Sequence, residues 1–381
     1  MQKKILIAPN AFKGSLSSIE AAKTIGLAVS SLNLGFKPIL TPIADGGDNT
    51  LDVISYYLQG TKFISCKVRN PLMKKIKSKW LMVGRDTAII ELARASGINL
   101  LKTRELNPLK ASTYGTGELI LSAVKYGCKK IILTLGGSAT VDAGIGILSA
   151  LGFKFYDKNK NLLIPSGRTL ELINSIDYKD VNSKIRRVKF YLLCDVENSL
   201  LGEKGVGMFA YQKGADHRTE KILLRGIKHY SRLVKKDIGV DYSKLKMMGA
   251  AGGVPFSIKS FFNAKLSSGF SFLSGLIELE KKIKDSGIII TGEGKLDRQT
   301  LMGKGLYRLA QIAKKHKKKV IVLCADYDSK ICWPKNGIDY IVSIRPKKLS
   351  LKKSIKKVKH LIRKAIRSNV KLFANSHKNI I

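Results

Sequence analysis

Residues 286–305 read SGIIITGEGKLDRQTLMGKG, and this stretch decides the fold class. Three consecutive isoleucines at positions 288–290 are typical of a short strand that is buried on both faces, which is the kind of strand that a parallel sheet contains. Residues 292–297 are too polar and too rich in glycine to continue a strand, so we expect a loop there. A helical pattern begins at Leu306. The stretch therefore predicts an α/β protein with a parallel sheet.

Charged side chains follow this strand directly. Ligands of open α/β sheets bind at the carboxyl ends of the strands, and Glu293, Lys295, Asp297 and Lys304 occupy that position. Two carboxylates and two lysines on flexible backbone predict a site for a phosphate group and a metal ion. Each charge taken alone also fits an ordinary strand-to-helix connection, and it is the cluster that favours the site.

Other predicted strands end in similar polar segments. Residues 5–8 are followed by a loop with Lys13 and Ser15, and either Ser15 or Ser17 caps the next helix. Residues 37–42 precede Asp45, and residues 191–196 carry Asp195 near the strand end. The carboxyl ends of parallel strands meet at one edge of a sheet, so these side chains are candidates for the same chemistry.

A glycine-rich segment follows the predicted strand at residues 131–135. It contains Gly136, Gly137, Ser138 and Thr140. Glycines let the backbone approach a ligand closely, and hydroxyl groups can donate hydrogen bonds to phosphate oxygens. The alternative is close packing between a helix and a strand. The chain has no G-x-x-x-x-G-K-[ST] motif, which excludes a Walker-type phosphate loop.

Bulk properties indicate a soluble protein of two domains. A chain of 381 residues exceeds the size at which a single core stops growing, and 44% hydrophobic with 25% charged residues is an ordinary globular composition. No apolar run approaches the roughly 18 residues that span a bilayer. The five scattered cysteines favour reduced thiols. We therefore expect a cytoplasmic protein without a membrane partner.

The formal net charge of +41 raises the possibility of a polyanion partner such as nucleic acid. The lysines are, however, spread along the whole chain, and no basic motif interleaved with aromatic residues stands out. Compositional drift in an AT-rich genome gives the same picture, and we favour it over specific nucleic-acid binding. In the tail after Arg345, the spacing of Ile355, Val358, Leu361 and Ile366 predicts an amphipathic helix docked on the sheet.

Taken together, the loops resemble one family, the class I glycerate kinases of bacteria. The ordered set that carries the resemblance is PNAFKGS at 9–15, ADGG at 44–47, TYGTGE at 113–118, GGSAT at 136–140 with Asp142, CDV at 194–196 with Asn198, QKGA at 212–215, GAAGG at 249–253, and GEGKLD at 292–297 with Gln299, Thr300, Gly303 and Lys304. No single piece is diagnostic, but their order and spacing cover nearly the whole chain.

The resemblance implies ATP-dependent phosphorylation of D-glycerate to a phosphoglycerate, with 2-phosphoglycerate favoured over 3-phosphoglycerate. It also implies a Rossmann-like parallel-sheet domain built from both chain ends, residues 1–66 and 286–381, with a second α/β domain of residues 67–285 inserted between them. Departures fall at Asn10, Asn49, Val141, Lys246–Met247 and Gly287 and near Asp326, where the family usually has Asp, Gly, Asn, a Pro-Gly pair, Asp and Gly.

Within this family framework each candidate residue has an expected role. Phosphoryl transfer needs positioned reactants, Mg²⁺ across the phosphates, cations, and a base near the attacking hydroxyl. We expect Asp195 to be the general base, with Asp45 as the second choice. We expect Lys13 and Ser15 to bind an anionic group, either the glycerate carboxylate or the transferred phosphate. Glu293 and Asp297 would hold Mg²⁺, and Lys304 would offset phosphate charge. The residues expected to bind the ATP phosphates are Gly136, Gly137, Ser138 and Thr140. A basic polyanion-binding protein and a non-catalytic kinase remnant are the alternatives. The oligomeric state is open.

Overall fold

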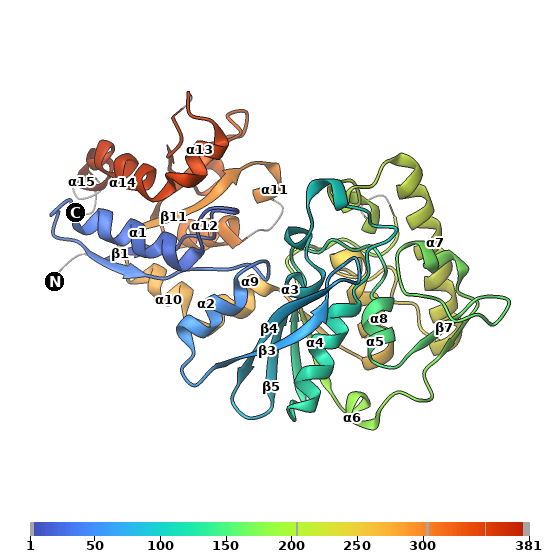
Figure 1. The fold of residues 1–381 in the computed structure, drawn as a ribbon. Helices are drawn as coiled ribbons and strands as arrows, with labels where there is room; N and C mark the ends of the chain where they lie inside the picture. Colours follow the sequence, from blue (N-terminus) through green and yellow to red (C-terminus); the bar gives the residue numbers. More distant parts are fainter. Residues whose placement is uncertain (1–3, 203–204, 302–304, 347, 376–381) are drawn as a thin grey trace. The chain divides into compact units, whose positions relative to one another are not determined.

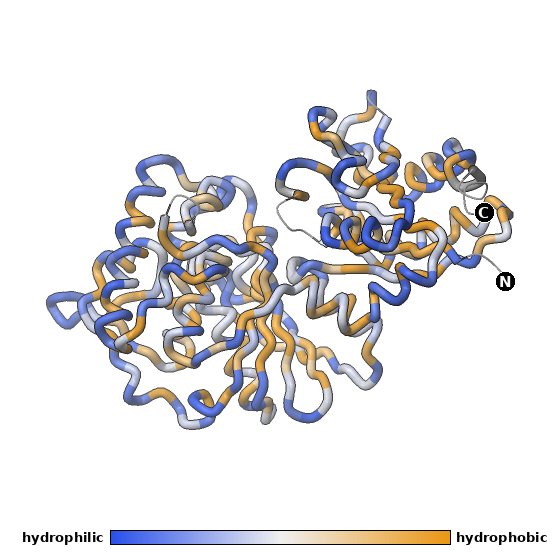
Figure 2. The backbone as a smooth tube through the Cα atoms, turned by 180° about the vertical axis from the view of Figure 1, so that it is seen from behind, coloured by the Kyte–Doolittle hydropathy of each residue, from blue (hydrophilic) through white to orange (hydrophobic). Residues whose placement is uncertain are grey.

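The computed structural model describes residues 4–202, 205–301, 305–346 and 348–375, and it forms two compact units (Figure 1). The first unit is discontinuous, with Met1–Asp45 and Phe270–Ile381, and the second is Gly46–Gly269. Each unit has strands rich in hydrophobic residues and a more hydrophilic set of surrounding loops (Figure 2). Among the described residues, no helix has the length and apolar character needed to cross a membrane.

The first unit contains a five-stranded parallel sheet of order β13-β12-β11-β1-β2. Its strands are β1 (Lys4–Ile7), β2 (Lys37–Leu40), β11 (Ile288–Leu296), β12 (Lys319–Tyr327) and β13 (Tyr340–Ser343). Ile5 pairs with Ile288 and Ile7 with Ile290, which confirms the prediction that the two chain ends share one parallel sheet. Ile5, Ile7 and Ile289 are fully buried, as expected for a sheet covered on both faces.

The strand β11 is longer than its sequence predicts. Instead of ending after Thr291, it continues through Gly292 and Glu293 to Leu296 and pairs with β12 over its whole length. A Cβ atom at Gly292 would lie 2.6 Å from the carbonyl oxygen of Leu323, so glycine here permits close strand contact rather than a loop. The expectation of a loop was therefore wrong for residues 292–296, and Asp297 is the first residue beyond the strand.

Helices cover this sheet. They are α1 (Ser18–Ser30), α9 (Gly269–Leu276), α10 (Leu279–Lys284), α11 (Arg298–Leu301), α12 (Gly305–Lys315), α13 (Leu351–Lys356), α14 (Val358–Ser368) and α15 (Val370–Asn375), with a 3₁₀ turn at Pro334–Asn336. Ser17 caps α1, since its side chain accepts a hydrogen bond from the Glu20 amide, whereas Ser15 donates to the carbonyl of Phe12.

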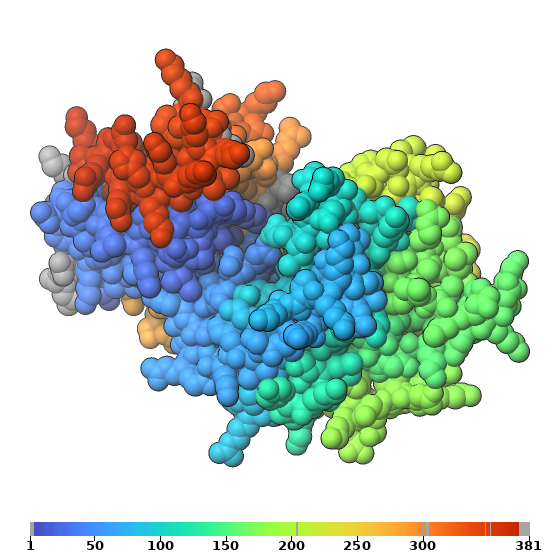
Figure 3. All heavy atoms as spheres, in the orientation of Figure 1, coloured from blue at the N-terminus to red at the C-terminus, as the bar shows by residue number. Residues whose placement is uncertain are grey.

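The basic tail forms separate helices rather than the one predicted. Leu361, Ile362 and Ile366 of α14 are buried in the same apolar cluster as Ile25 and Val29 of α1. In Figure 3 this C-terminal part, in red, lies directly against the N-terminal part, in blue, which agrees with the packing of α14 on α1. The predicted docking of the tail is confirmed, but the helix is interrupted at Lys357.

The second unit contains a six-stranded mixed sheet of order β10-β9-β6-β5-β4-β3. Its strands are β3 (Lys62–Arg69), β4 (Lys75–Val83), β5 (Thr87–Glu91), β6 (Lys130–Thr134), β9 (Lys189–Leu193) and β10 (Lys265–Ser267), while β7 (Lys154–Tyr156) and β8 (Ser175–Asp177) form a separate antiparallel pair. The pairs from β5 to β10 are parallel, and β3 and β4 are antiparallel additions at one edge.

Helices and 3₁₀ turns complete this unit. The helices are α2 (Thr50–Tyr57), α3 (Ala93–Ser96), α4 (Tyr114–Lys125), α5 (Ile145–Ala150), α6 (Ser183–Arg186), α7 (His217–Ile238) and α8 (Val254–Phe262), and the 3₁₀ turns are Ile98–Leu100, Thr103–Glu105, Arg168–Leu172, Val206–Phe209, Tyr211–Lys213 and Ala250–Gly252. Together they bury one large apolar cluster that includes Trp80, Phe155 and Tyr230.

The boundaries between the two compact units differ from the expected ones near residues 66 and 285. They fall after Asp45 and after Gly269. All of β3 pairs with β4, from Lys62↔Met82 to Arg69↔Lys75, so residues 62–66 belong to the second unit. Helix α10 packs against α12 and therefore belongs to the first unit. The amino-acid composition changes near residue 65, which is why the boundary was expected there. The unit to which a strand belongs is decided by the strand it pairs with, and composition does not reveal that partner.

Candidate functional site

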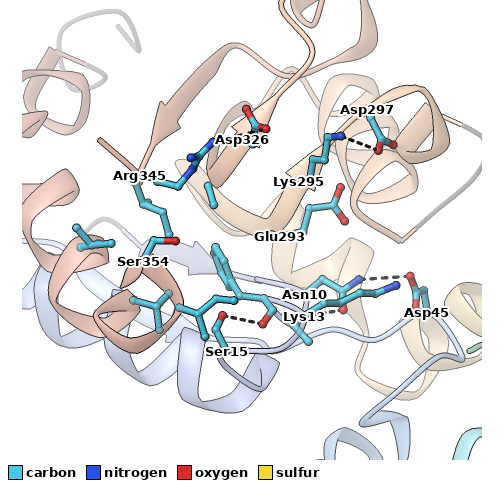
Figure 4. A pocket seen from close by; sticks show the side chains of 18 residues that line it. Asn10, Lys13, Ser15, Asp45, Glu293, Lys295, Asp297, Asp326, Arg345 and Ser354 are labelled. Carbon is cyan, nitrogen blue, oxygen red and sulfur yellow. Dashed lines mark hydrogen bonds and ion pairs between the residues drawn. The ribbon is translucent and has the colours of Figure 1, made fainter. Parts of the chain in front are cut away.

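The first unit has a pocket of about 540 Å³ at the carboxyl ends of its strands (Figure 4). The C-terminal parts of β11 and β12 line it, together with segments that follow β1, β2, β11 and β13 and with helices α13 and α14. This is where ligands of open parallel sheets bind. The lining residues are Asn10, Ala11, Phe12, Lys13, Ser15, Asp45, Glu293, Gly294, Lys295, Asp297, Ala325, Asp326, Ile344, Arg345, Ser354, Ile355, Val358 and Leu361.

The loop after β1 presents one positive charge to this pocket. The Phe12 amide donates to the carbonyl of Leu16, and the Ser15 hydroxyl donates to the carbonyl of Phe12. Gly14 lies between them at φ 74°, a left-handed conformation that glycine adopts without strain. This tight turn leaves Lys13 exposed at the edge of the pocket. Because the turn fixes its backbone, Lys13 can meet an anion at little cost in chain entropy.

The end of β11 supplies two carboxylates. Glu293 is buried, and its Oε1 atom accepts a hydrogen bond of 2.8 Å from the Thr300 hydroxyl. The Asp297 amide donates to that same hydroxyl oxygen at 3.2 Å, so Thr300 links both acidic residues. Lys295 lies 4.0 Å from an Asp297 carboxylate oxygen. The pocket thus combines acidic and basic groups at alternate positions along the end of β11 and just beyond it.

Asp45 and Asn10 form a further polar pair. The Asn10 amide nitrogen donates to Oδ2 of Asp45 at 3.3 Å, and both residues line the pocket. The departure at Asn10 therefore falls within the site. The departure at Gly287 does not, because Gly287 precedes β11 at the opposite end of the strand. Asn49 and Met247 have φ values of 68° and 72°, which explains why glycine is usual at these two positions.

The thiol of Cys324 is unsuited to nucleophilic chemistry. It lies opposite Glu293 in the pairing of β11 with β12. Burial, and then the nearby Glu293 carboxylate, raise the pKa of this thiol to about 12. A thiol with such a pKa stays protonated at neutral pH, and the thiolate is the reactive form. The reactive groups of the pocket are its carboxylates, amines and hydroxyls.

The donor set of the pocket fits a hard cation that phosphate groups help to hold. Within the described part of the chain, no three His, Cys, Asp or Glu side chains come together as a complete metal cage. Mg²⁺ does not need one, because it is commonly bound by one or two carboxylates together with water and substrate phosphates. Glu293 and Asp297 both offer carboxylate oxygens, and the Thr300 hydroxyl bonds the Glu293 carboxylate and the backbone amide of Asp297.

The predicted glycine-rich loop and Asp195 belong to the second unit. Gly136, Gly137, Ser138 and Thr140 follow β6, and backbone hydrogen bonds fix the loop, for example from the Ile98 amide to the carbonyl of Gly137 at 2.8 Å. A Cβ atom at Gly136 would lie 2.5 Å from the Cα atom of Gly47, so this glycine is needed for close packing. The loop packs tightly at Gly136, as one sequence interpretation has it. The other interpretation, that the loop backbone contacts a ligand, is compatible with the same structure.

Asp195 follows β9 in the same unit and accepts a hydrogen bond from the hydroxyl of Ser268, which follows the neighbouring strand β10. It is half-buried at the carboxyl end of parallel strands, as predicted. Asp195 is not among the lining residues of the pocket in the first unit. Lys304 lies outside the described residues.

The sequence did not predict that Lys213 is buried. Its ammonium group donates to the Ser138 hydroxyl and to the carbonyl of Thr140, both at 2.7 Å. Burial lowers the pKa of Lys213 to about 7, an effect that Asp142 opposes. Asp142 is itself fully buried and accepts hydrogen bonds from the Thr113 amide and hydroxyl, while burial raises its pKa. The one sequence signal was the QKGA match at 212–215.

Comparison with known proteins identifies the class. The model of the glycerate kinase family matches residues 5–374, so the chain belongs to the glycerate kinase family. It is therefore a kinase, a phosphotransferase that acts on an alcohol group, and kinases take a nucleotide as the phosphoryl donor.

Individual relatives agree with this assignment. A glycerate kinase of Halalkalibacterium halodurans is 34% identical over 370 residues, which cover 96% of each chain. The glycerate 2-kinase of Escherichia coli is 35% identical over 344 residues, or 90% of each chain. The solved structure described as glycerate kinase 2 from Salmonella typhimurium LT2 superposes with a TM-score of 0.79 at 31% identity and covers 99% of this chain and 100% of its own. The predicted family, fold class and enzyme class are confirmed.

Proposed function

We propose that this enzyme transfers the γ-phosphoryl group of ATP to the hydroxyl on carbon 2 of D-glycerate, giving ADP and 2-phosphoglycerate, with Mg²⁺ as the metal ion. The choice of carbon 2 over carbon 3 is supported by the Escherichia coli relative, whose name is glycerate 2-kinase. We further propose that the reaction takes place in the cytoplasm, where ATP is available.

The observation that carries the proposal is the pocket at the carboxyl ends of β1 and β11. It gathers Asp45, Glu293 and Asp297 with Lys13 and Lys295. Catalysis of phosphoryl transfer is almost entirely positioning and electrostatic stabilisation of phosphate oxygens. A site for it needs carboxylates for a metal ion and cations for the phosphates, and this pocket offers both. The intact set of carboxylates also argues against a non-catalytic remnant.

Each group in the pocket then has a role. Glu293 and Asp297 would hold Mg²⁺, which when bound neutralises charge on the phosphates. Lys13 would place its ammonium group on an anionic group, either the glycerate carboxylate or the transferred phosphate. Ser15 would donate a hydrogen bond to the same anion, after its hydroxyl turns away from the carbonyl of Phe12.

The general base remains a choice between two carboxylates. Asp195 is the first candidate and Asp45 the second. Whichever acts accepts the proton of the carbon-2 hydroxyl, whose oxygen forms the new bond to the γ-phosphorus as the bond to the β-phosphate oxygen breaks. Replacing each by asparagine separates the two, because only loss of the true base should lower kcat steeply and remove the acidic limb of the pH profile.

The glycine-rich loop supplies a further set of contacts. We propose that Gly136, Gly137, Ser138 and Thr140 cradle phosphate groups, and that Lys304 offsets phosphate charge. The support is the rigid backbone of the loop and the lysine that Ser138 and Thr140 hold beneath it. A ligand that meets a preformed loop loses less ordering entropy than one that must organise it.

The test is a kinetic assay with product identification. Purified protein is given ATP, Mg²⁺ and D-glycerate, ADP release is followed with a coupled assay, and the product is identified by phosphorus NMR. We expect ADP release that depends on D-glycerate, stops on chelation of Mg²⁺, and yields 2-phosphoglycerate. L-glycerate is the control acceptor. A 3-phosphoglycerate product would contradict the carbon assignment, and no glycerate-dependent ADP release would contradict the proposed function.

A further inference from the structure

The pocket of the first unit has two chemically different halves. One half carries Lys13, Asp45, Glu293, Lys295 and Asp297, which lie toward the right of Figure 4. The other half is lined by apolar side chains around Arg345 and Ser354, which lie toward the left. The larger apolar residues of the lining include Ile344, which precedes Arg345, and Ile355, Val358 and Leu361, which follow Ser354 on α13 and α14; Phe12 and Ala325 are also apolar lining residues.

Glycerate alone leaves the apolar half unexplained. The acid has three carbon atoms, and each carries a carboxylate or a hydroxyl group, so it gains nothing from apolar walls. The pocket volume of about 540 Å³ lies in the range that holds drug-sized ligands. The polar half offers what glycerate or phosphate groups need. The apolar half requires a ligand part that is large and weakly hydrated.

We propose that the apolar half binds the nucleoside of the phosphoryl donor, with its base between the C-terminal helices and Phe12 and its phosphates directed to Lys13 and Lys295. This inference rests on the proposed function, since it assigns the donor to this pocket. It makes the C-terminal segment, α13 and α14, the nucleoside-binding element of the enzyme.

The walls of this half are preformed. Phe12 is buried, and a Cβ atom at Gly292 would lie 3.0 Å from its ring, so the ring packs closely over β11. Val358 and Leu361 belong to the apolar cluster that joins α14 to α1. The Ile344 amide donates to the carbonyl of Cys324 at 2.8 Å, which fixes the end of β13 against β12. A flat base can enter such walls without ordering them first.

Arg345 provides a polar contact within this half. Its guanidinium group lies 3.7 Å from the Asp326 carboxylate and donates to the carbonyl of Leu349 at 3.3 Å. The Nε atom of Arg345 is buried and has no hydrogen-bond partner among the described residues. A guanidinium plane stacks well on aromatic rings and donates to ring nitrogens or ribose hydroxyls. Apolar walls with one such group suit a purine nucleoside better than an alkyl chain.

Ile355 on α13 allows a direct test, because it lines the pocket and is 36% exposed, so a larger side chain there can be accommodated without rebuilding the core. Ile355→Trp should fill the apolar half and raise the KM for ATP about tenfold or more, while the KM for D-glycerate stays within twofold. Leu27→Trp is the matched control, since Leu27 is exposed on α1 and does not line the pocket. The control should leave both KM values unchanged.

A second measurement does not depend on turnover. Adenosine, which lacks phosphates, should raise the Tm of the wild-type protein and of Leu27→Trp, but not that of Ile355→Trp. If Ile355→Trp fails to fold, Ile355→Asp replaces it, because a carboxylate in the apolar half should exclude the base as well. Adenosine should also compete with ATP and not with D-glycerate.

The outcomes separate this inference from the proposed function. Unchanged KM values in Ile355→Trp, or a raised KM for D-glycerate alone, would overturn the nucleoside assignment while glycerate phosphorylation stood. A wild-type protein without glycerate kinase activity would overturn the proposed function. In that case the adenosine-induced shift in Tm would still decide whether this half binds a nucleoside.

Discussion

Thr300 shows how a single side chain organises the proposed metal site. It is fully buried, it donates to the Glu293 carboxylate, and it accepts from the Asp297 amide. The hydroxyl of threonine can do both at once, because it has one donor and two lone pairs. A residue that touches no substrate in the proposed mechanism thereby ties the Glu293 carboxylate to the backbone of Asp297.

Asp297 is the sharpest point at which to test that site. Asp297→Asn removes a negative charge and nearly preserves shape, so kcat should fall roughly 10²-fold or more, the scale seen when one charge-stabilising group is lost. The Tm should change little, because Asp297 is partly exposed. Asp180→Asn, at an exposed position of the second unit, is the control. Near-normal turnover of Asp297→Asn would remove Asp297 from the proposed metal ligands.

Lys213 leads to a prediction about pH. Among the described residues it is the one buried lysine, and it makes no ion pair there. The pKa of Lys213 is about 7 in the folded protein, whereas the ordinary value for lysine is 10.5. Between pH 7 and pH 10.5, Lys213 is therefore protonated in the unfolded chain but mostly neutral in the folded protein. The free energy of unfolding must then rise with pH across that window, at up to about 1.4 kcal/mol per pH unit from this group.

Lys213→Met should abolish this contribution. Urea unfolding at pH 7.0 and 9.0 measures it, and the gain in unfolding free energy between the two should be smaller in the variant by up to about 2 kcal/mol. Lys184→Met, at an exposed position, should behave like the wild type. If the unfolding free energies of Lys213→Met and the wild type rise equally between the two pH values, the ammonium group of Lys213 is not desolvated in solution. That result would contradict the buried contact between Lys213 and Ser138.

Among the elements, β11 shows what sequence patterns can and cannot predict. The three isoleucines were enough to identify a buried parallel strand, because few other structures accommodate such a run. The extension through Gly292 and Glu293 could not be predicted, since it depends on the partner β12, which begins at Lys319. Local polarity favours a loop, but backbone pairing with a neighbour decides the outcome.

The same distinction holds for the site. Lys13, Asp45, Glu293 and Asp297 all come after apolar stretches that read as buried strands, and polar residues in that place are a signal that sequence carries, although Glu293 itself lies within β11. The structure brings these four to one pocket. The apolar half was not predicted, because Val358 and Leu361 read only as the buried face of a helix. Lys213 was not identified as buried, because a lysine in a short loop is normally exposed.

Helices α4 and α5 give a prediction about packing. A Cβ atom at Gly117 would lie 2.5 Å from the Cβ atom of Ala150 and 2.8 Å from the carbonyl oxygen of Ile147. Gly117→Ala should therefore lower the unfolding free energy of the second unit by about 2 kcal/mol, despite the better helix propensity of alanine. Gly275→Ala in α9 is the control, because its Cβ would meet nothing within 4 Å. Equal stability of the two variants, measured by urea unfolding, would show that α5 can move away freely.

At the scale of the whole molecule, the net charge of +41 has to be reconciled with a kinase. Lysines lie on many elements, and apart from Lys213 the described ones are exposed or half-buried. Charge that is spread in this way attracts phosphate backbones without reading sequence. It also favours the approach of anionic substrates such as a nucleotide and glycerate.

We therefore predict only weak, salt-sensitive binding to DNA. Affinity for a labelled duplex, measured by fluorescence anisotropy, should fall steeply between about 50 and 200 mM salt, because binding driven by phosphate contacts releases counterions. Scrambled and mixed-sequence duplexes of equal length serve as matched probes. Selective binding to one sequence that persists at about 200 mM salt would support the polyanion-binding alternative instead.

The pairing of β1 with β11 has a consequence for biosynthesis. Ala8 and Thr291, which are hydrogen-bonded, stand 283 positions apart. Ribosomes add about 5–20 residues per second, so the first strand waits roughly 15–60 s for its neighbour on one side. The unit Gly46–Gly269 is continuous and emerges complete during that wait. A nascent chain of this protein thus carries an unpaired, isoleucine-rich strand edge beside a finished domain, which is the kind of segment that chaperones shield.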